Sequence, residues 1–182
     1  MDTIKRHTLA ILVDNEAGVL SQVTRLFSRK GYNIESITVG TTDNERVSRM
    51  TIEIMSSRSQ TELLCNQLRK LLPVHSVLIL SDEAIRRELV FIKVAAATSE
   101  ARGEVIQIAN IFRASIIDVS TGSMTITVIG EESKVDAIYR LLQKYTVLEL
   151  VRAGIVALER GEKTIHDETK EKGEFNYGKH VL

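Results

Sequence analysis

Cysteine, proline and aromatic residues are scarce in this sequence of 182 residues, and neither sign of charge predominates. The single cysteine, Cys65, excludes an intramolecular disulfide, and a cysteine-based metal site would lack its other thiolates. Because Cys65 lies in a leucine-rich stretch, we expect it to be buried as a small hydrophobic side chain. The 24 basic residues balance 24 acidic ones. Nucleic acid and anionic membrane surfaces are therefore not the expected partners.

Long apolar runs are also missing. Runs such as 8–13 and 155–158 are far shorter than the roughly 20 residues that span a bilayer. The first residues include Asp2 and Lys5 and lead into a short apolar run with no small-residue cleavage site, unlike a secretory signal. We therefore expect no membrane segment and a cytoplasmic protein.

The order strand, helix, strand, strand, helix, strand occurs twice along the chain. The expected strands of the first half are 7–13, 33–39, 47–55 and 74–80, and its helices are 19–30 and 59–72, the second ended by Pro73. The expected strands of the second half are 89–97, 115–120, 124–129 and 147–158, the last broken at 152–154, and its helices are 104–112 and about 135–142. The pattern predicts an α+β protein of two tandem ferredoxin-like (βαββαβ) domains, each an antiparallel sheet with both helices on one face.

The charged stretch 81–88 separates the two halves. We place the domains at 1–81 and 82–162, followed by a charged tail, 163–182, that we expect to be mobile. A short helix near 164–172, formed only with a partner, is the less favoured alternative. The first strand is apolar on both faces, so a partner subunit or the other half of the chain should cover the face that the helices leave open.

No pattern for catalysis or metal binding is evident. The histidines have no ligand spacing; they are His7, His75, His166 and His180. A serine elbow, a phosphate-binding glycine loop and a dinucleotide fingerprint are all missing. The acidic residues fit helix starts and solvated faces. We expect no catalytic residue, no metal and no cofactor in this chain.

The segment 14–20, between the first strand and the first helix, is the best candidate for a ligand site. A helix N-terminus presents unpaired N–H groups and a partial positive charge, so a carboxylate can bind there without a basic side chain. Gly18 allows close approach, and Asn15 can both donate and accept hydrogen bonds. Val19, Leu20 and Ile34 could line a pocket for a branched aliphatic side chain. An Asx turn with helix capping explains the segment equally well without a ligand.

Several runs resemble one family closely. They are DNEAGVL (14–20), LFSRKGYNIESITV (26–39) and SRMTI (48–52) in the first half, with IFRA (111–114), IIDV (116–119) and RAGIVAL (152–158) in the second. Together they resemble the regulatory (small) subunit of acetohydroxyacid synthase, also called acetolactate synthase, over about residues 4–162. The strand, loop, glycine and leucine at the start are shared by ACT domains generally, which sense small molecules in amino-acid metabolism.

The resemblance implies a non-catalytic subunit that activates a large catalytic subunit and confers feedback inhibition by valine, or by leucine or isoleucine in some members. The large subunit would hold thiamine diphosphate, Mg²⁺ and FAD. Its reaction joins two pyruvates into 2-acetolactate with loss of CO₂, or pyruvate with 2-oxobutanoate, in branched-chain amino-acid biosynthesis.

The resemblance also implies where valine binds. ACT domains of this kind form homodimers side by side and bind effectors where the two copies meet. One subunit would contribute Asn15, Gly18, Val19 and Leu20, and the facing subunit Asn33 and Ile34, with Ser21 and Gly40 nearby.

Two other functions stay open at this point. One is a stand-alone, amino-acid-sensing ACT protein that regulates transcription, although the sequence has no recognition helix or basic stripe. The other is an enzyme with a site between the domains, which the absence of converging titratable groups disfavours.

Overall fold

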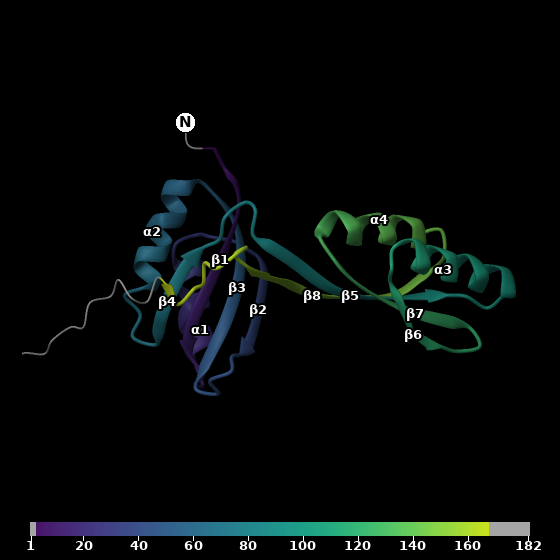
Figure 1. The fold of residues 1–182 in the computed structure, drawn as a ribbon, viewed down its shortest axis with the longest axis horizontal. Helices are drawn as coiled ribbons and strands as arrows, with labels where there is room; N and C mark the ends of the chain where they lie inside the picture. The colour runs from purple at the N-terminus through teal and green to yellow at the C-terminus, as the bar shows by residue number, and fades with distance from the viewer. Residues whose placement is uncertain (1–2, 168–182) are drawn as a thin grey trace, which may run out of the picture. The chain divides into compact units, whose positions relative to one another are not determined.

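A computed structural model describes residues 3–167, which form two compact units. The first unit contains the chain up to Ile85 together with the segment that starts at Ala157, and the second contains Arg86–Val156. Each unit has one four-stranded antiparallel sheet and two helices (Figure 1). The predicted class, two tandem ferredoxin-like domains, is confirmed.

The first unit has the predicted order of elements. They are β1 (Lys5–Asp14), α1 (Val19–Arg29), β2 (Ile34–Thr41), β3 (Val47–Ser56), α2 (Arg58–Leu68) and β4 (Val74–Ile79). The sheet order is β2-β3-β1-β4, so β2 and β4 are its edges. Alternate side chains of β1, at Leu9, Ile11 and Val13, are fully buried and pack in one core with Phe27 of α1 and Leu64 of α2. This two-residue period places the helix-covered core on one face of the sheet.

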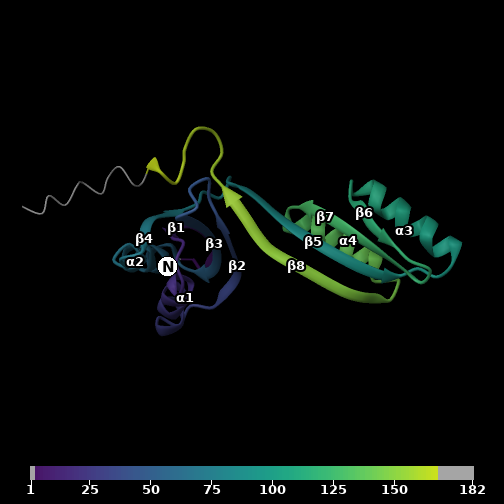
Figure 2. The same cartoon turned by 90° about the horizontal axis from the view of Figure 1, so that it is seen from below.

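The other face of this sheet is covered by the chain itself. Residues 157–167, which we call the return segment, belong to the first unit. The Arg49 guanidinium donates to the Ala157 carbonyl (2.8 Å), and the Ser76 hydroxyl donates to the Ile165 carbonyl (3.2 Å). Ile165 is buried, as is Leu12, which pairs with both Arg49 and Ser76. Figure 2 shows this segment, in yellow, continuing from β8. Its course accounts for the apolar residues on both faces of β1.

Helix α2 ends four residues earlier than predicted. Its start is fixed by a capping box in which Ser57 and Gln60 bond reciprocally. After Leu68 the backbone tightens, because the Leu71 N–H donates to the Leu68 carbonyl three residues back (3.0 Å). The chain must leave the helix here for Val74 to pair with β1. Leu72, expected on the apolar face of the helix, is therefore almost fully exposed.

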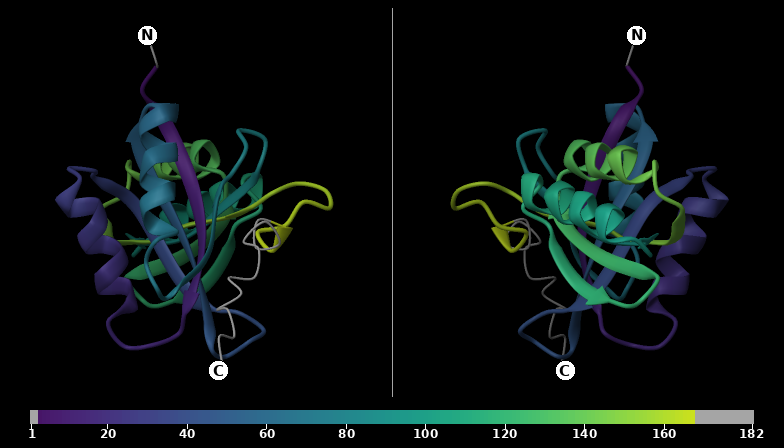
Figure 3. Two further views of the ribbon diagram at one scale, coloured as in Figure 1. Left: turned by 90° about the vertical axis from the view of Figure 1, so that its left-hand side faces the viewer. Right: turned by 90° about the vertical axis from the view of Figure 1, so that its right-hand side faces the viewer.

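The second unit repeats the arrangement. Its elements are β5 (Ile85–Ala95), α3 (Ser99–Ile111), β6 (Ser115–Val119), β7 (Ser123–Gly130), α4 (Glu132–Leu142) and β8 (Val147–Leu158), in the sheet order β6-β7-β5-β8. The right-hand view of Figure 3 shows α3 and α4 side by side against this sheet. Val105 of α3 and Ile138 of α4 pack with Ile92, Val94 and Ile126 of the sheet.

Among the boundaries of the second unit that differ from the prediction, two have a clear physical cause. Helix α3 begins five residues earlier than expected, because the Thr98 hydroxyl accepts from the Ala101 N–H (3.1 Å) and caps the helix there. Strand β8 is not broken at 152–154 but continues for 12 residues. Gly154 has a φ of +86°, a value that glycine adopts without strain. The predicted break at 152–154 is therefore wrong, because β8 accommodates this glycine without interruption.

The tail prediction is tested only in part. Residues 168–182, including His180 and most of the alternative helix at 164–172, lie outside the described residues. Residues 163–167 form the end of the return segment and close with a turn in which Asp167 accepts from the Thr164 N–H (2.7 Å).

Candidate effector-binding site

Asn15 is held firmly at the end of β1 by the loop between β2 and β3. Its backbone N–H donates to the Arg46 carbonyl and its side-chain amide donates to the Glu45 carbonyl, both at 2.8 Å. Its side-chain oxygen accepts from the buried Ser48 hydroxyl at 3.0 Å. The amide is therefore oriented by the protein, not by capping of α1. An amide has a second N–H and a second oxygen lone pair, which suit it to contact a ligand as well.

The start of α1 is formed by Gly18 in the left-handed conformation, with a φ of +88°. The Gly18 carbonyl accepts the first helical bond from Gln22 (3.0 Å), and no side chain caps the helix. The Asx-turn capping considered above is therefore not formed. A Cβ atom added at Gly18 would have no atom within 4 Å. The N-terminus of α1 is thus open to an anionic group, which its dipole favours.

The two apolar residues that follow Gly18 differ in accessibility. Val19 is buried in the core with Val23, so its side chain does not line an open surface, contrary to the sequence expectation. Leu20 is 45% exposed beside the helix start. Ser21 is exposed as well. Of the predicted apolar contacts at this end of the sheet, only Leu20 is available to a ligand.

Asn33 and Ile34 lie at the opposite end of the sheet from Asn15. Ile34 pairs with Ile54 of β3, which pairs with His7 near the start of β1. From His7 to Asn15 is eight residues, or roughly 27 Å along an extended strand. One chain therefore does not bring the two predicted halves of the site together. Gly40, at the far end of β2, pairs with Arg49 and lies at the Asn15 end.

The side chains of Asn33 and Ile34 differ in their contacts. The Asn33 amide is exposed and donates to the Glu35 carboxylate (2.8 Å). Ile34 is half-buried and packs against the core. Asn33 precedes β2 and Ile34 begins it, and β2 is an edge strand of the first sheet.

Two residues near Asn15 were not predicted as part of the site. Ser48 orients the Asn15 amide. The feature of the sequence that could have indicated this role is the position of Ser48 at the start of the SRMTI run. The His75 imidazole of β4 contacts the carboxylate of Asp14, the residue before Asn15, at 2.7 Å. No local pattern links positions 61 residues apart, so sequence reasoning could not find this pair.

Charged groups of the second unit form structural ion pairs. The buried Glu88 carboxylate accepts from the Arg152 guanidinium at 2.6 Å, which raises the pKa of Arg152. The Glu104 carboxylate accepts from both Lys144 (2.6 Å) and Tyr145. These bonds lower the pKa of Glu104, and the bond from Lys144 raises the pKa of Lys144 to about 12. Burial, and then the bond to Glu104, raises the pKa of Tyr145. Each group already has a partner that explains its position.

Within residues 3–167, no three His, Cys, Asp or Glu side chains are placed to hold a metal ion together. Cys65 is buried, as predicted. In the same part of the chain, no helix has the length and apolarity to cross a membrane.

Comparison with known proteins identifies both units. Residues 9–76 match the model of the AHAS small subunit-like ACT domain, and residues 87–161 match the model of the small subunit of acetolactate synthase. The fold, together with the ACT-domain match of the first unit, therefore places this chain in the class of ACT-domain proteins.

Similarity over almost the whole chain narrows the class further. The acetolactate synthase small subunit of Haemophilus influenzae is 46% identical over 162 residues, which cover 88% of this chain and 99% of that one. The small subunit of Mycolicibacterium smegmatis is 41% identical over 160 residues, 87% of this chain and 94% of that one. The crystal structure of the small subunit from Thermotoga maritima has a TM-score of 0.82 at 38% identity, covering 88% of this chain and all of that one. The chain belongs to the family of acetolactate synthase small subunits, which implies a large, catalytic partner subunit.

Proposed function

We propose that this chain is the regulatory subunit of acetolactate synthase, which activates the catalytic subunit and confers feedback inhibition by valine. Membership of the small-subunit family supports the regulatory role. Catalysis would belong to the large subunit, with its thiamine diphosphate, Mg²⁺ and FAD. The controlled reaction would be the condensation of pyruvate to 2-acetolactate in the synthesis of valine, leucine and isoleucine.

The main observation in support of a valine site shared between two chains is that the two groups of predicted site residues lie far apart on one chain. Asn15 and Gly18 lie at one end of the sheet, Asn33 and Ile34 lie at the other, and β2 between them is an edge strand of the sheet. If two copies pair antiparallel along β2 about a two-fold axis, the start of one β2 lies beside the end of the other. Asn33 of one copy then approaches the Asn15 end of its partner, and this happens twice per dimer.

The chemistry of the two halves suits an amino acid with a branched side chain. The α1 N-terminus would receive the carboxylate, and the oriented Asn15 amide would contact the carboxylate or the ammonium group. Leu20 of one copy and Ile34 of the other would enclose the aliphatic side chain. Valine would then bind well only to the paired arrangement, and would shift the population toward it.

Subunit mixing tests this shared site. Asn15→Ala and Asn33→Ala should each abolish or strongly weaken valine binding in calorimetric titration, beside leucine, isoleucine and threonine as comparators. In an equimolar mixture of the two variants, half the dimers combine one chain of each kind, and each such dimer has one undamaged site. About a quarter of all sites should therefore regain normal affinity. A mixture that recovers no binding would contradict a site shared between chains.

A co-purification experiment tests the regulatory role separately. The chain should form a complex with the acetolactate synthase large subunit, raise its activity and make it sensitive to valine. A chain that binds valine but neither binds nor activates the large subunit would instead support the stand-alone ACT regulator.

A further inference from the structure

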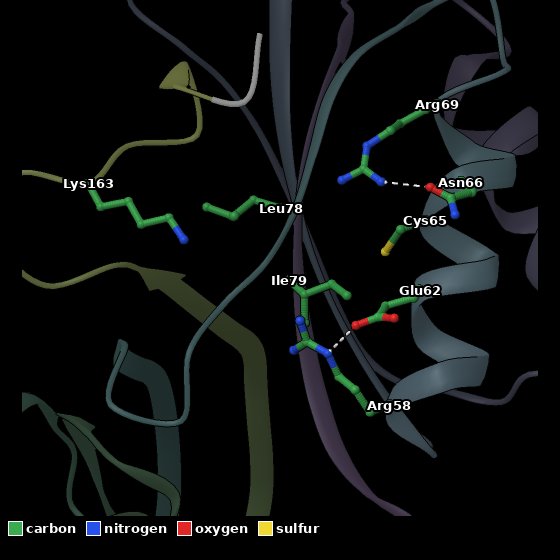
Figure 4. A pocket seen from close by; sticks show the side chains of 8 residues that line it. All are labelled: Arg58, Glu62, Cys65, Asn66, Arg69, Leu78, Ile79 and Lys163. Atoms are coloured by element: carbon green, nitrogen blue, oxygen red, sulfur yellow. Dashed lines mark hydrogen bonds and ion pairs between the residues drawn. The ribbon is translucent and has the colours of Figure 1, made fainter. Parts of the chain in front are cut away.

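A cavity of about 330 Å³ in the first unit lies between α2, β4 and the return segment (Figure 4). Three cationic side chains line it, from Arg58 in α2, Arg69 at the C-cap of α2 and Lys163 in the return segment, with Glu62 as the carboxylate among the lining residues. Ile79 of β4 is also in the lining, and it pairs with Leu9 of β1. Leu9 is six residues from Asn15, or roughly 20 Å along the strand, so this cavity is distinct from the candidate valine site.

The cations around the cavity are held in different ways. The Arg69 guanidinium is fixed by bonds to the Asn66 side-chain oxygen (3.1 Å) and the Val77 carbonyl (2.7 Å). The Arg58 Nε donates to Glu62 at 2.7 Å, which leaves the other side of its guanidinium fork to face elsewhere. Within residues 3–167, the Lys163 ammonium has no ion pair or hydrogen bond, and Figure 4 shows its side chain extending from the return segment toward β4.

The positive charges in this cavity exceed the negative one. Arg58 and Arg69 are 11 positions apart on one helix, and Lys163 comes from a segment about a hundred residues later. With Glu62 as the carboxylate of the lining, the cavity has a net positive charge that a bound anion would offset. Guanidinium forks match the oxygen geometry of phosphate, and a lysine ammonium adds a point charge. The volume is near the lower end for small-molecule sites.

We propose that this cavity binds a phosphate group, either inorganic phosphate or the phosphate monoester of a small metabolite. The dianion would lie between the guanidinium groups of α2 and the ammonium of Lys163. Binding would join the return segment to α2 through a shared ligand. This site does not depend on the valine site or on the large subunit.

Calorimetric titration of the full chain tests the proposal, with inorganic phosphate and glycerol 3-phosphate as separate probes in a low-salt, phosphate-free buffer. We expect saturable binding of at least one probe at one site per chain. Lys163→Gln should weaken it by about tenfold, since one charge-assisted contact is lost. Glu62→Gln should tighten it, because the opposing carboxylate is removed. Binding of glycerol 3-phosphate in preference to inorganic phosphate would identify a monoester as the ligand class, and the reverse preference would identify the free ion.

Lys70→Gln is the matched control. Lys70 is exposed near the end of α2, carries the same charge and does not line the cavity. Its removal should leave the affinity unchanged. The proposal is overturned if neither probe binds saturably at millimolar concentration, or if Lys70→Gln weakens binding as much as Lys163→Gln. Unchanged thermal unfolding of Lys163→Gln would show that its loss of binding is not a loss of fold.

Discussion

At the scale of single residues, the geometry of the candidate valine site depends on a buried hydroxyl. Ser48 donates to the side-chain oxygen of Asn15, and the loop carbonyl of Glu45 accepts from its amide. Both contacts come from outside the 14–20 segment. The loop between β2 and β3 therefore determines which way the amide faces.

Ser48→Ala should weaken valine binding several-fold while lowering the free energy of unfolding by only about 1 kcal/mol, because one hydrogen bond is removed and the Asn15 amide can then rotate. Calorimetry with valine and urea unfolding measure the two effects. Ser28→Ala is the control, because it likewise removes one serine hydrogen bond, here to the backbone carbonyl of Thr24 (3.2 Å), near the other end of α1. Equal losses of valine affinity in both variants would contradict a positioning role for Ser48.

Gly18 allows charge to be separated from backbone strain. Gly18→Ala and Gly18→Asp both place a side chain at a φ of +88°, at a cost of about 1 kcal/mol, and the Cβ that both add has no atom within 4 Å. Only the aspartate adds a carboxylate that repels the carboxylate of valine. The reconstituted enzyme should become valine-resistant with Gly18→Asp and stay clearly more sensitive with Gly18→Ala, as measured by inhibition curves. Full inhibition of the aspartate variant would count against a site at this helix N-terminus.

At the scale of elements, the sequence predicts the order and type of every helix and strand but not all of their ends. The alternation in β1 and the helical spacing of Val23 and Phe27 are direct consequences of which face is buried. The end of α2 depends instead on the pairing of Val74 with β1, which is a tertiary requirement. Likewise β8 continues through Gly154 because the strand pairs with β5, whereas the sequence alone suggests a turn.

The sequence likewise predicts the location of the candidate site but not the environment of every side chain in it. The turn residues of 14–18 predicted a loop followed by a helix start, and Asn15, Gly18 and Leu20 lie there in the structure. That these residues bind valine stays a prediction. The predicted site also included Val19, whose side chain the core requires, since the first helical residue faces the sheet. A motif conveys which positions a family shares, but not whether a position serves packing or binding.

The link between α3 and the residues after α4 gives a pH prediction. Glu104 of α3 has a lowered pKa, so its contribution to stability is present above the pKa of the unfolded chain and is lost as pH falls through the folded value. Lys144 has its pKa raised to about 12, so its contribution is complete below its ordinary value of 10.5 and is lost as pH rises through about 12. The pKa of Tyr145 is also raised, so the contribution of Tyr145 to stability is likewise lost as pH rises.

Lys144→Gln should therefore lower the melting temperature slightly at neutral pH. It should also flatten the pH dependence of the melting temperature, both in the acidic range where Glu104 titrates and in the alkaline range where Lys144 titrates. Thermal unfolding from acidic to strongly alkaline pH measures this. Lys134→Gln serves as the control, because the Lys134 ammonium donates to a backbone carbonyl and not to a carboxylate (3.0 Å). Parallel pH profiles for Lys144→Gln and the parent chain would contradict the coupling.

At the scale of the whole molecule, the two structural units differ in how the chain forms them: the first unit is built from two separate stretches of sequence and the second from one. The chain completes its second sheet and then contributes the return segment to the first unit. The buried Glu159 carboxylate accepts from both the N–H and the hydroxyl of Ser81 at 2.7 Å, and Arg160 donates to the Glu83 carbonyl at 2.7 Å. A linear division near residue 82 misses this, because the charged composition of 163–182 predicts a solvated tail and gives little weight to Ile165.

Ile165 provides the test of this arrangement. Ile165→Ala removes a side chain that is only 4% exposed, which should destabilise the return segment by about 2–4 kcal/mol. In hydrogen exchange, amides of the return segment and of Ser81, whose N–H donates to Glu159, should then exchange at least about 30-fold faster. Amides within 86–156 should keep their rates, because they belong to the other unit. Ile111→Ala, at a residue 74% exposed in α3, should change neither set. Faster exchange throughout the second unit in Ile165→Ala would mean that the segment supports both units, and unchanged exchange at Ser81 would mean that it does not cover the first sheet in solution.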